Sequence, residues 1–221
     1  AVMRVINKDQ EKATLQLEAF KWTQDERGAD QYAPTQDIVF FPKILTLEKN
    51  EEKIVRVGYQ GGPEKNERTY RLYLEELPVS KPGEIAVKTV LRMGVPIFIE
   101  PIEPQRKSRI DGLEVRAGAV GITVKNTGNQ HVLVSKLKAT ARSAADAEMF
   151  SGEVGGWYVL SGASSTFYLD FPKEACEKSK IIKLAIQLQP QADMAAESEV
   201  NPSQCRGDAQ NKKEPVKKGP D

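Results

Sequence analysis

Short runs of alternating apolar and polar residues, separated by turns, constrain the fold of this chain more than any other feature. Clear examples are Ala13–Trp22, Val120–Val124 and Ile181–Leu188. A period of two places successive side chains on opposite faces of a β-strand. No segment carries the apolar spacing of a sustained amphipathic helix. Regular short strands with turns between them predict an all-β chain, folded as an antiparallel sandwich or barrel.

The longest strand pattern is Val87–Ile99, with the sequence VKTVLRMGVPIFI. Its odd-numbered residues are almost wholly apolar. Strands in globular proteins usually run about 5–6 residues, so we expect this one to extend beyond the sheet that covers it. An uncovered apolar strand pairs readily with another chain. The segment therefore faces either the core of its own domain, a partner, or both.

Two prolines in Glu100–Gln105 favour a stiff, extended connection and suggest a domain boundary. The chain has 221 residues, enough for two domains. We expect a first domain over residues 1–101, a linker over 102–105 and a second domain over 106–189. Apolar residues become rare from about Pro190 onward, so residues 190–221 are predicted to form a mostly disordered tail.

Strand-like alternation starts at once, in Val2–Ile6. Two interpretations are open: a leader was removed, or the sequence begins inside the fold, with a first strand preceding Ala1. No run approaches the ~18 apolar residues that a membrane span requires.

The charge and the motif content give no support to catalysis or to nucleic-acid binding. Lys and Arg total 32 against 31 Asp and Glu, a net charge of +1, which favours neither nucleic acid nor an anionic membrane surface as partner. His131 is the single histidine, and with two cysteines it cannot supply a zinc site at the usual spacings. No nucleophile elbow, phosphate-binding loop or dinucleotide fingerprint occurs. We therefore expect no enzyme activity, no cofactor and no metal.

The two cysteines, Cys176 and Cys205, lie in the C-terminal region of the sequence. In an exported protein they would pair, and the closed loop would stabilise the fold by roughly 3 kcal/mol. The alternative is a pair of unrelated free thiols in a cytosolic protein. A disulfide would also tether the predicted tail.

Several phrases, in their order and spacing, resemble the periplasmic chaperones of chaperone–usher pilus assembly, and most of all the archaic branch. The match covers most of residues 2–188, and its phrases are Val5–Asn7, the strand ending at Trp22, Tyr32–Asp37, Phe41–Leu47, Ile54–Gly58, Thr69–Pro78, Val95–Pro101 and Gly156–Gly162.

The resemblance implies two immunoglobulin-like β-sandwiches in an L-shaped arrangement, with a cleft between them. In this family the last strand of the first domain completes the sandwich of a fimbrial subunit, which is then delivered to an outer-membrane usher. By position, the donor residues are Val87, Thr89, Leu91 and Met93. Val95, Ile97 and Ile99 are assigned to the core of the domain itself.

The implied location is the periplasm. The implied partners are pilus subunits and the usher, with no nucleic acid and no membrane insertion. Self-association through the donor strand is a further expectation.

One departure from the family concerns the basic residues that bind the C-terminal carboxylate of the subunit. The family uses one residue on the first strand and one on the donor strand. Here we expect the first strand to be missing, and Pro96 occupies the second position. A guanidinium binds a carboxylate through two parallel hydrogen bonds. Arg92 and Arg71 are therefore the candidate anchors, and for either residue a role as a surface charge is the alternative.

A second hypothesis describes the chain as a structural or adhesive protein of tandem immunoglobulin-like domains. Strand 87–99 would then be fully internal. In that case, aspartate at Leu91 or Met93 would unfold the protein instead of abolishing a complex.

Overall fold

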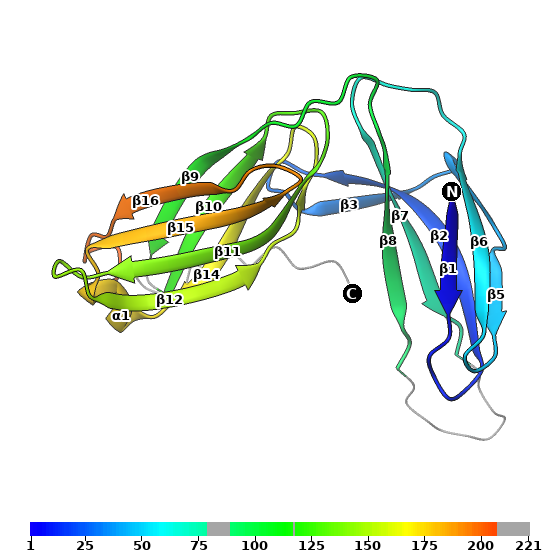
Figure 1. Cartoon of the computed structure of the whole chain (residues 1–221), viewed down its shortest axis with the longest axis horizontal. Helices are drawn as coiled ribbons and strands as arrows, with labels where there is room; N and C mark the ends of the chain where they lie inside the picture. The colour runs from blue at the N-terminus through cyan, green and yellow to red at the C-terminus, as the bar shows by residue number, and fades with distance from the viewer. Residues whose placement is uncertain (79–88, 117, 207–221) are drawn as a thin grey trace.

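The computed structural model describes residues 1–78, 89–116 and 118–206, and these residues form mostly β-strands (Figure 1). In this part of the chain the strands form two groups: β1 to β8 pair only with one another, and so do β9 to β16. The strands of the two groups run in different directions, which makes the molecule L-shaped (Figure 1). The predicted all-β fold with two sandwiches is confirmed.

The first group forms two facing antiparallel sheets, with strand orders β1-β6-β4 and β3-β2-β7-β8, and β5 also pairs with β2. Its strands are β1 (Val2–Ile6), β2 (Ala13–Gln24), β3 (Asp30–Pro34), β4 (Ile38–Phe41), β5 (Ile44–Leu47), β6 (Glu52–Tyr59), β7 (Arg68–Glu76) and β8 (Arg92–Ile99). The core between the sheets is made of Val5, Leu15, Leu17, Leu45, Leu47, Val55, Leu72 and Leu74.

Strand β2 shows how alternation builds this half. Leu15 and Leu17 are buried in the core, whereas Gln16 and Glu18 lie on the opposite, outer face. Trp22 shares the outer parity, yet it is fully buried. The reason is tertiary: side chains of the second group cover this end of the sheet, among them Trp157 and Tyr158.

The second group also forms two sheets, with orders β14-β10-β9 and β12-β11-β15-β16, and β13 pairs with β11. Its elements are β9 (Ser108–Arg116), β10 (Gly118–Asn126), β11 (Val132–Arg142), β12 (Glu148–Gly155), β13 (Tyr158–Val159), β14 (Ser164–Phe171), α1 (Lys173–Lys178), β15 (Ile181–Gln189) and β16 (Met194–Glu199). Its core is formed by the apolar side chains that alternate along each strand, as in Val120, Ile122 and Val124 of β10.

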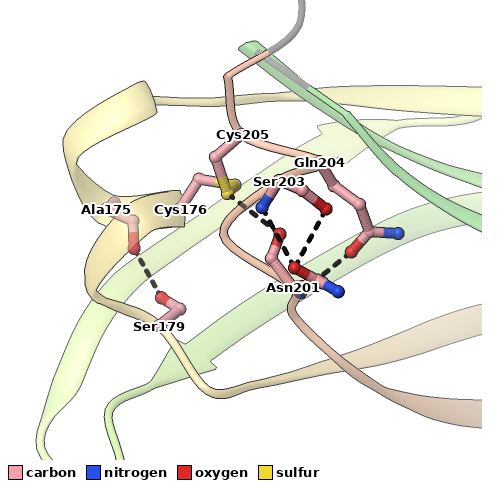
Figure 2. Close-up of a disulfide and its surroundings, with 7 residues drawn as sticks. All are labelled: Ala175, Cys176, Ser179, Asn201, Ser203, Gln204 and Cys205. Atoms are coloured by element: carbon pink, nitrogen blue, oxygen red, sulfur yellow. Dashed lines mark hydrogen bonds between the residues drawn. A yellow bond between two sulfur atoms is a disulfide. The ribbon is translucent and has the colours of Figure 1, made fainter.

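A disulfide joins Cys176 in α1 to Cys205 beyond β16, with both sulfur-bearing side chains fully buried (Figure 2). The prediction that the two cysteines pair is confirmed. Asn201 organises the turn that carries Cys205, because its side-chain oxygen accepts hydrogen bonds from the amide and hydroxyl of Ser203 (Figure 2).

Part of the predicted tail is folded. Residues 194–199 form β16, which pairs with β15, and Val200 is buried in the core. The tail prediction was therefore wrong over this stretch, because alanine and serine carry little of the apolar signal that marks a strand. Residues 207–221 lie outside the described part. The domain boundary at residue 101 and the linker over 102–105 stay predictions.

Helix α1 is a second element that the sequence did not indicate. It has six residues, too few to display a helical period. No helix in the described ranges is long and apolar enough to cross a membrane.

Of the predicted strand 87–99, residues 87 and 88 lie outside the described part, and within residues 89–99 the strand is shorter than predicted. Strand β8 begins at Arg92, and Thr89 to Leu91 precede it without strand geometry. The cause is its neighbour: β7 ends at Glu76, and the last link is the Glu76 N–H bonded to the Leu91 carbonyl. Beyond that point the described residues provide no strand with which this segment can pair.

Candidate functional site

Strand β8 lies at the edge of its sheet and pairs with β7 alone among the described strands. Its register runs from Arg68 opposite Ile99 to Glu75 opposite Arg92. Since Glu76 donates to the carbonyl of Leu91, the alternation of an antiparallel ladder makes the odd-numbered residues bond to β7. The amides and carbonyls of even-numbered residues then face away, at a free edge.

Pro96 interrupts this free edge, because proline has no N–H to donate. Proline is tolerated on an edge strand where its nitrogen faces away from the ladder, as it does here. The carbonyl of Gly94, the preceding even-numbered residue, accepts a hydrogen bond from Nη1 of Arg71 at 3.0 Å. An added strand would therefore find a continuous edge only up to about Gly94.

The odd-numbered face of β8 divides into two parts. Val95 and Ile97 pack against the core of the first half. Met93 and Leu91 continue the same face but are 38% and 49% exposed. Thr89 is also exposed, and Val87 lies outside the described residues. The exposed apolar side chains thus lie on the same face as the packed part of the strand and come directly before it in the chain.

Arg71 lies on the outer face of β7, opposite Pro96, and is only 5% exposed. Its guanidinium carbon is 4.2 Å from the ring centre of Trp22 and 5.0 Å from that of Trp157. Nε and Nη2 are buried and have no hydrogen-bond acceptor among the described residues. A buried cation with unused donors is costly unless an anion or another acceptor reaches it.

Arg92 has a different environment, about four residues from Pro96 along β8. Its guanidinium forms an ion pair with Glu75 at 3.3 Å and lies 4.1 Å from the ring centre of Tyr73. The structure therefore does not bring the two candidate anchors together. Arg71 lies where the two halves meet, whereas Arg92 is already paired with a carboxylate of its own sheet.

Hydrogen bonds hold the two halves together beside Arg71. The side chain of Gln24 donates to the carbonyl of Tyr158 and accepts from the amide of Leu160, both at 2.9 Å. The indole of Trp157 donates to Asp30 at 2.9 Å. Gly28, with a φ of +77°, allows the turn before β3 to approach Ser165, where a Cβ would come within 2.2 Å of the hydroxyl oxygen.

A second set of contacts joins the two halves through Glu67 and His131. Glu67 accepts from the His131 amide at 2.7 Å and lies 2.9 Å from the ring nitrogen Nδ1. The His131 ring stacks on Phe98 with centres 3.6 Å apart. The single histidine is thus a packing residue between the halves. Within the described ranges, no group of three or more His, Cys, Asp or Glu could hold a metal ion.

The sequence offered Arg71 as one of two candidate anchors but did not indicate the residues around it. Gln24 and Asp30 carried no motif, Trp157 entered only as part of the phrase Gly156–Gly162, and the partners of these residues lie up to 136 positions away in the sequence. One signal was available: Trp22 follows Gln16 and Glu18 on the polar parity of β2, where a tryptophan indicates a covered surface.

Residues 1–105 match the family described as "Pili and flagellar-assembly chaperone, PapD N-terminal domain". The search of curated proteins returns no match.

Among solved structures, a chain of the CsuC–CsuE chaperone–tip adhesion subunit complex from archaic Csu pili of Acinetobacter baumannii is 19% identical, with a TM-score of 0.56 over 89% of both chains. A chain of the Salmonella enterica SafA pilin–SafB chaperone complex is 14% identical, with a TM-score of 0.56 over 90% of this chain and 88% of that one. The Pseudomonas aeruginosa CupB2 chaperone is 15% identical, with a TM-score of 0.52 over 91% and 92%. At these identities the likeness shows a shared fold.

Proposed function

We propose that this chain, whose residues 1–105 match the pili and flagellar-assembly chaperone family, holds fimbrial subunits in the periplasm by donor-strand complementation and delivers them to an outer-membrane usher. The observation that carries this proposal is the free edge of β8, which continues into exposed apolar residues. Main-chain hydrogen bonds to such an edge give affinity, and pockets for alternate side chains give specificity.

The donor residues in this proposal are Leu91, Met93, Thr89 and Val87. The first two expose apolar side chains beside the free edge. Such an edge is an aggregation hazard in a protein that does not use it. Val95 and Ile97 anchor the strand in the core, so the donor strand is fixed at one end and accessible at the other.

We also propose that Arg71 binds the C-terminal carboxylate of the subunit. Two of its nitrogens have no acceptor among the described residues. Arg71 lies opposite Pro96, close to where the continuous part of the β8 edge ends. A subunit strand paired along the edge would have its terminus near this guanidinium. The ion pair of Arg92 with Glu75 makes Arg92 the weaker candidate.

Co-expression with a pilus subunit from the same source tests the donor strand. The wild-type chain is expected to give a stable 1:1 complex, and the double variant Leu91→Asp, Met93→Asp to give none, because charged side chains cannot enter apolar pockets without a large desolvation cost. Ile54→Asp is the matched control, since Ile54 is 51% exposed but lies on the other sheet.

Unchanged binding by the double variant would refute the assignment of the donor residues. A double variant that unfolds, as judged by circular dichroism, would instead favour the tandem-domain hypothesis, in which this strand is internal.

A further inference from the structure

The environment of Arg71 is built from both halves of the molecule. Trp22 belongs to β2, whereas Trp157 and Tyr158 belong to the second half. The guanidinium carbon lies within 5.8 Å of all three ring centres. Cation–π contacts of this kind depend on the position of each ring and are stronger where water is excluded.

Asp30 holds two of these rings. Its Oδ1 accepts from the indole of Trp22 at 2.8 Å and from Gln24 at 3.0 Å. Its Oδ2 accepts from the indole of Trp157 at 2.9 Å and from the hydroxyl of Tyr32 at 3.1 Å. One carboxylate at the start of β3 therefore connects a ring of the first half to a ring of the second.

Tyr32 contributes a stable donor to this group. Burial, and then its contact with the Tyr73 hydroxyl and the charge of Asp30, raise the pKa of Tyr32 above its usual value. Its hydroxyl keeps its proton at neutral pH and donates a hydrogen bond to Asp30. These four donors to Asp30 are all neutral groups, so the carboxylate of Asp30 is held by hydrogen bonds without a cation among them.

We infer that Asp30 is a positioning residue for Arg71: it holds the tryptophan rings of both halves around the guanidinium, so that a carboxylate is recognised only when the two halves are docked. This inference rests on the proposed function, because it takes the free carboxylate of a polypeptide as the ligand. It adds that the second half contributes a wall of the site through Trp157.

Intrinsic fluorescence can report on this site directly, since Trp22 and Trp157 are the only tryptophans of the chain. The probes are N-acetyl-leucine, which carries a free carboxylate, and N-acetyl-leucinamide, which does not, titrated at constant ionic strength. For the wild-type chain we expect a saturable change in emission with the acid at about tenfold lower concentration than with the amide, the size of one charged hydrogen-bonded contact.

Asp30→Asn tests the positioning role. An amide has one oxygen, so it can keep the bond from the buried Trp22 but not also the bond from Trp157. We expect the preference for the acid to fall from about tenfold to below about threefold. Asp37→Asn is the matched control, because Asp37 accepts a bond from Tyr70 at 2.8 Å in the same half but does not contact either tryptophan by a hydrogen bond that the structure describes. This control is expected to keep the full preference.

Trp157→Phe provides an independent test that leaves the carboxylate of Asp30 in place. The phenyl ring keeps an aromatic surface but cannot donate to Asp30, so the preference for the acid should again fall. Folding of each variant is checked by its thermal midpoint. A folded Asp30→Asn or Trp157→Phe variant with the full preference would overturn the inference.

Subunit co-expression distinguishes a failure of this inference from a failure of the proposed function. If the wild-type chain binds a subunit but shows no preference for the acid probe, the anchor and its positioning are wrong while donor-strand binding stands. If the wild-type chain binds no subunit, the proposed function itself fails.

Discussion

Arg71 is the residue at which stability and proposed function oppose each other most clearly. Its guanidinium is buried against two indole rings, with Nη1 bonded to a backbone carbonyl and two other nitrogens without acceptors among the described residues. An unsatisfied buried donor costs about 1–3 kcal/mol, and more when it is charged. The cation–π contacts offset part of that cost. A residue kept for packing alone would not carry this penalty.

Arg71→Met should therefore leave the free energy of unfolding of the free protein unchanged within about 1 kcal/mol, or raise it, because it removes the unsatisfied donors and keeps the apolar stem. Subunit affinity should fall at least about tenfold. Urea denaturation and a binding titration measure the two effects. A loss of more than about 3 kcal/mol with intact subunit binding would identify Arg71 as a structural residue.

Tyr70 makes the stability of the first half dependent on pH in the alkaline range. Its side chain is fully buried, and its hydroxyl donates to Asp37 at 2.8 Å. Burial, and then this hydrogen bond and the charge of Asp37, raise the pKa of Tyr70 above its usual value of 10.0. In the unfolded chain the hydroxyl ionises near pH 10, whereas in the folded protein it keeps its proton.

The unfolded state therefore releases a proton that the folded state retains, and stability falls as the pH rises above about 10. Below that pH the contribution is constant. We expect Tyr70→Phe to reduce the slope of the free energy of unfolding against pH between 10 and 11, at the cost of about 1 kcal/mol at neutral pH for the lost hydrogen bond. A slope identical to that of the wild type would show that other groups control the alkaline transition.

Strand β8 and Leu91 just before it combine two environments, and the alternation of side chains explains both. All odd-numbered residues point to the same face, but only Val95 and Ile97 have the opposite sheet above them. Met93 and Leu91 extend past the covered region and remain exposed. One apolar face thus serves as core at one end and as accessible surface at the other.

Alanine substitutions should separate the two parts of the strand. Val95→Ala and Ile97→Ala are expected to lower the free energy of unfolding by about 1–2 kcal/mol each, since both side chains are partly buried. Leu91→Ala and Met93→Ala should change it by less than about 0.5 kcal/mol. Urea denaturation provides the values. Equal losses at all four positions would mean that the whole strand is internal, as the tandem-domain hypothesis requires.

The disulfide links two short elements of the second half. It joins α1 to the turn after β16 across 29 residues. Closing a loop of that length removes conformational entropy from the unfolded chain and stabilises the fold by about 3–4 kcal/mol in the chain-entropy model. The double variant Cys176→Ser, Cys205→Ser should lose about this amount in denaturant unfolding. A loss under about 1 kcal/mol would show that packing alone holds these elements.

The relation between the two halves depends on polar contacts and aromatic packing. Gln24, Asp30 and Glu67 of the first half each bond to the second, and the rings of Trp22, Phe98, Trp157, Tyr158 and His131 lie between them. Directional hydrogen bonds at several points favour one relative orientation. The environment of Arg71 is complete only in that orientation.

Gln24→Ala should loosen this arrangement, because it removes both side-chain bonds to Tyr158 and Leu160. We expect a broader distribution of distances between spin labels at the exposed positions Lys49 and Lys183, with little change in the fold of either half. Gln16→Ala is the matched control, on the same face of β2, because its side chain donates to Glu18 and makes no bond to the second half among the described residues. Equal distributions for both variants would show that aromatic packing alone sets the orientation.

Alternation of apolar residues was enough to determine the all-β class, most strands and the parity that forms each core, because a period of two is a local property of the chain. The resemblance carried by short phrases added expectations: the family, a donor strand and Arg71 as a candidate anchor. Neither the alternation nor the resemblance could predict the start of β8, the strand β16 or the contacts of Asp30. Each depends on a neighbour: β7 ends at Glu76, β15 offers an edge to alanines and serines, and Asp30 meets Trp157 across 127 positions. Pairing partners and contacts between the halves exist only once the chain has folded, so tertiary structure alone decided them.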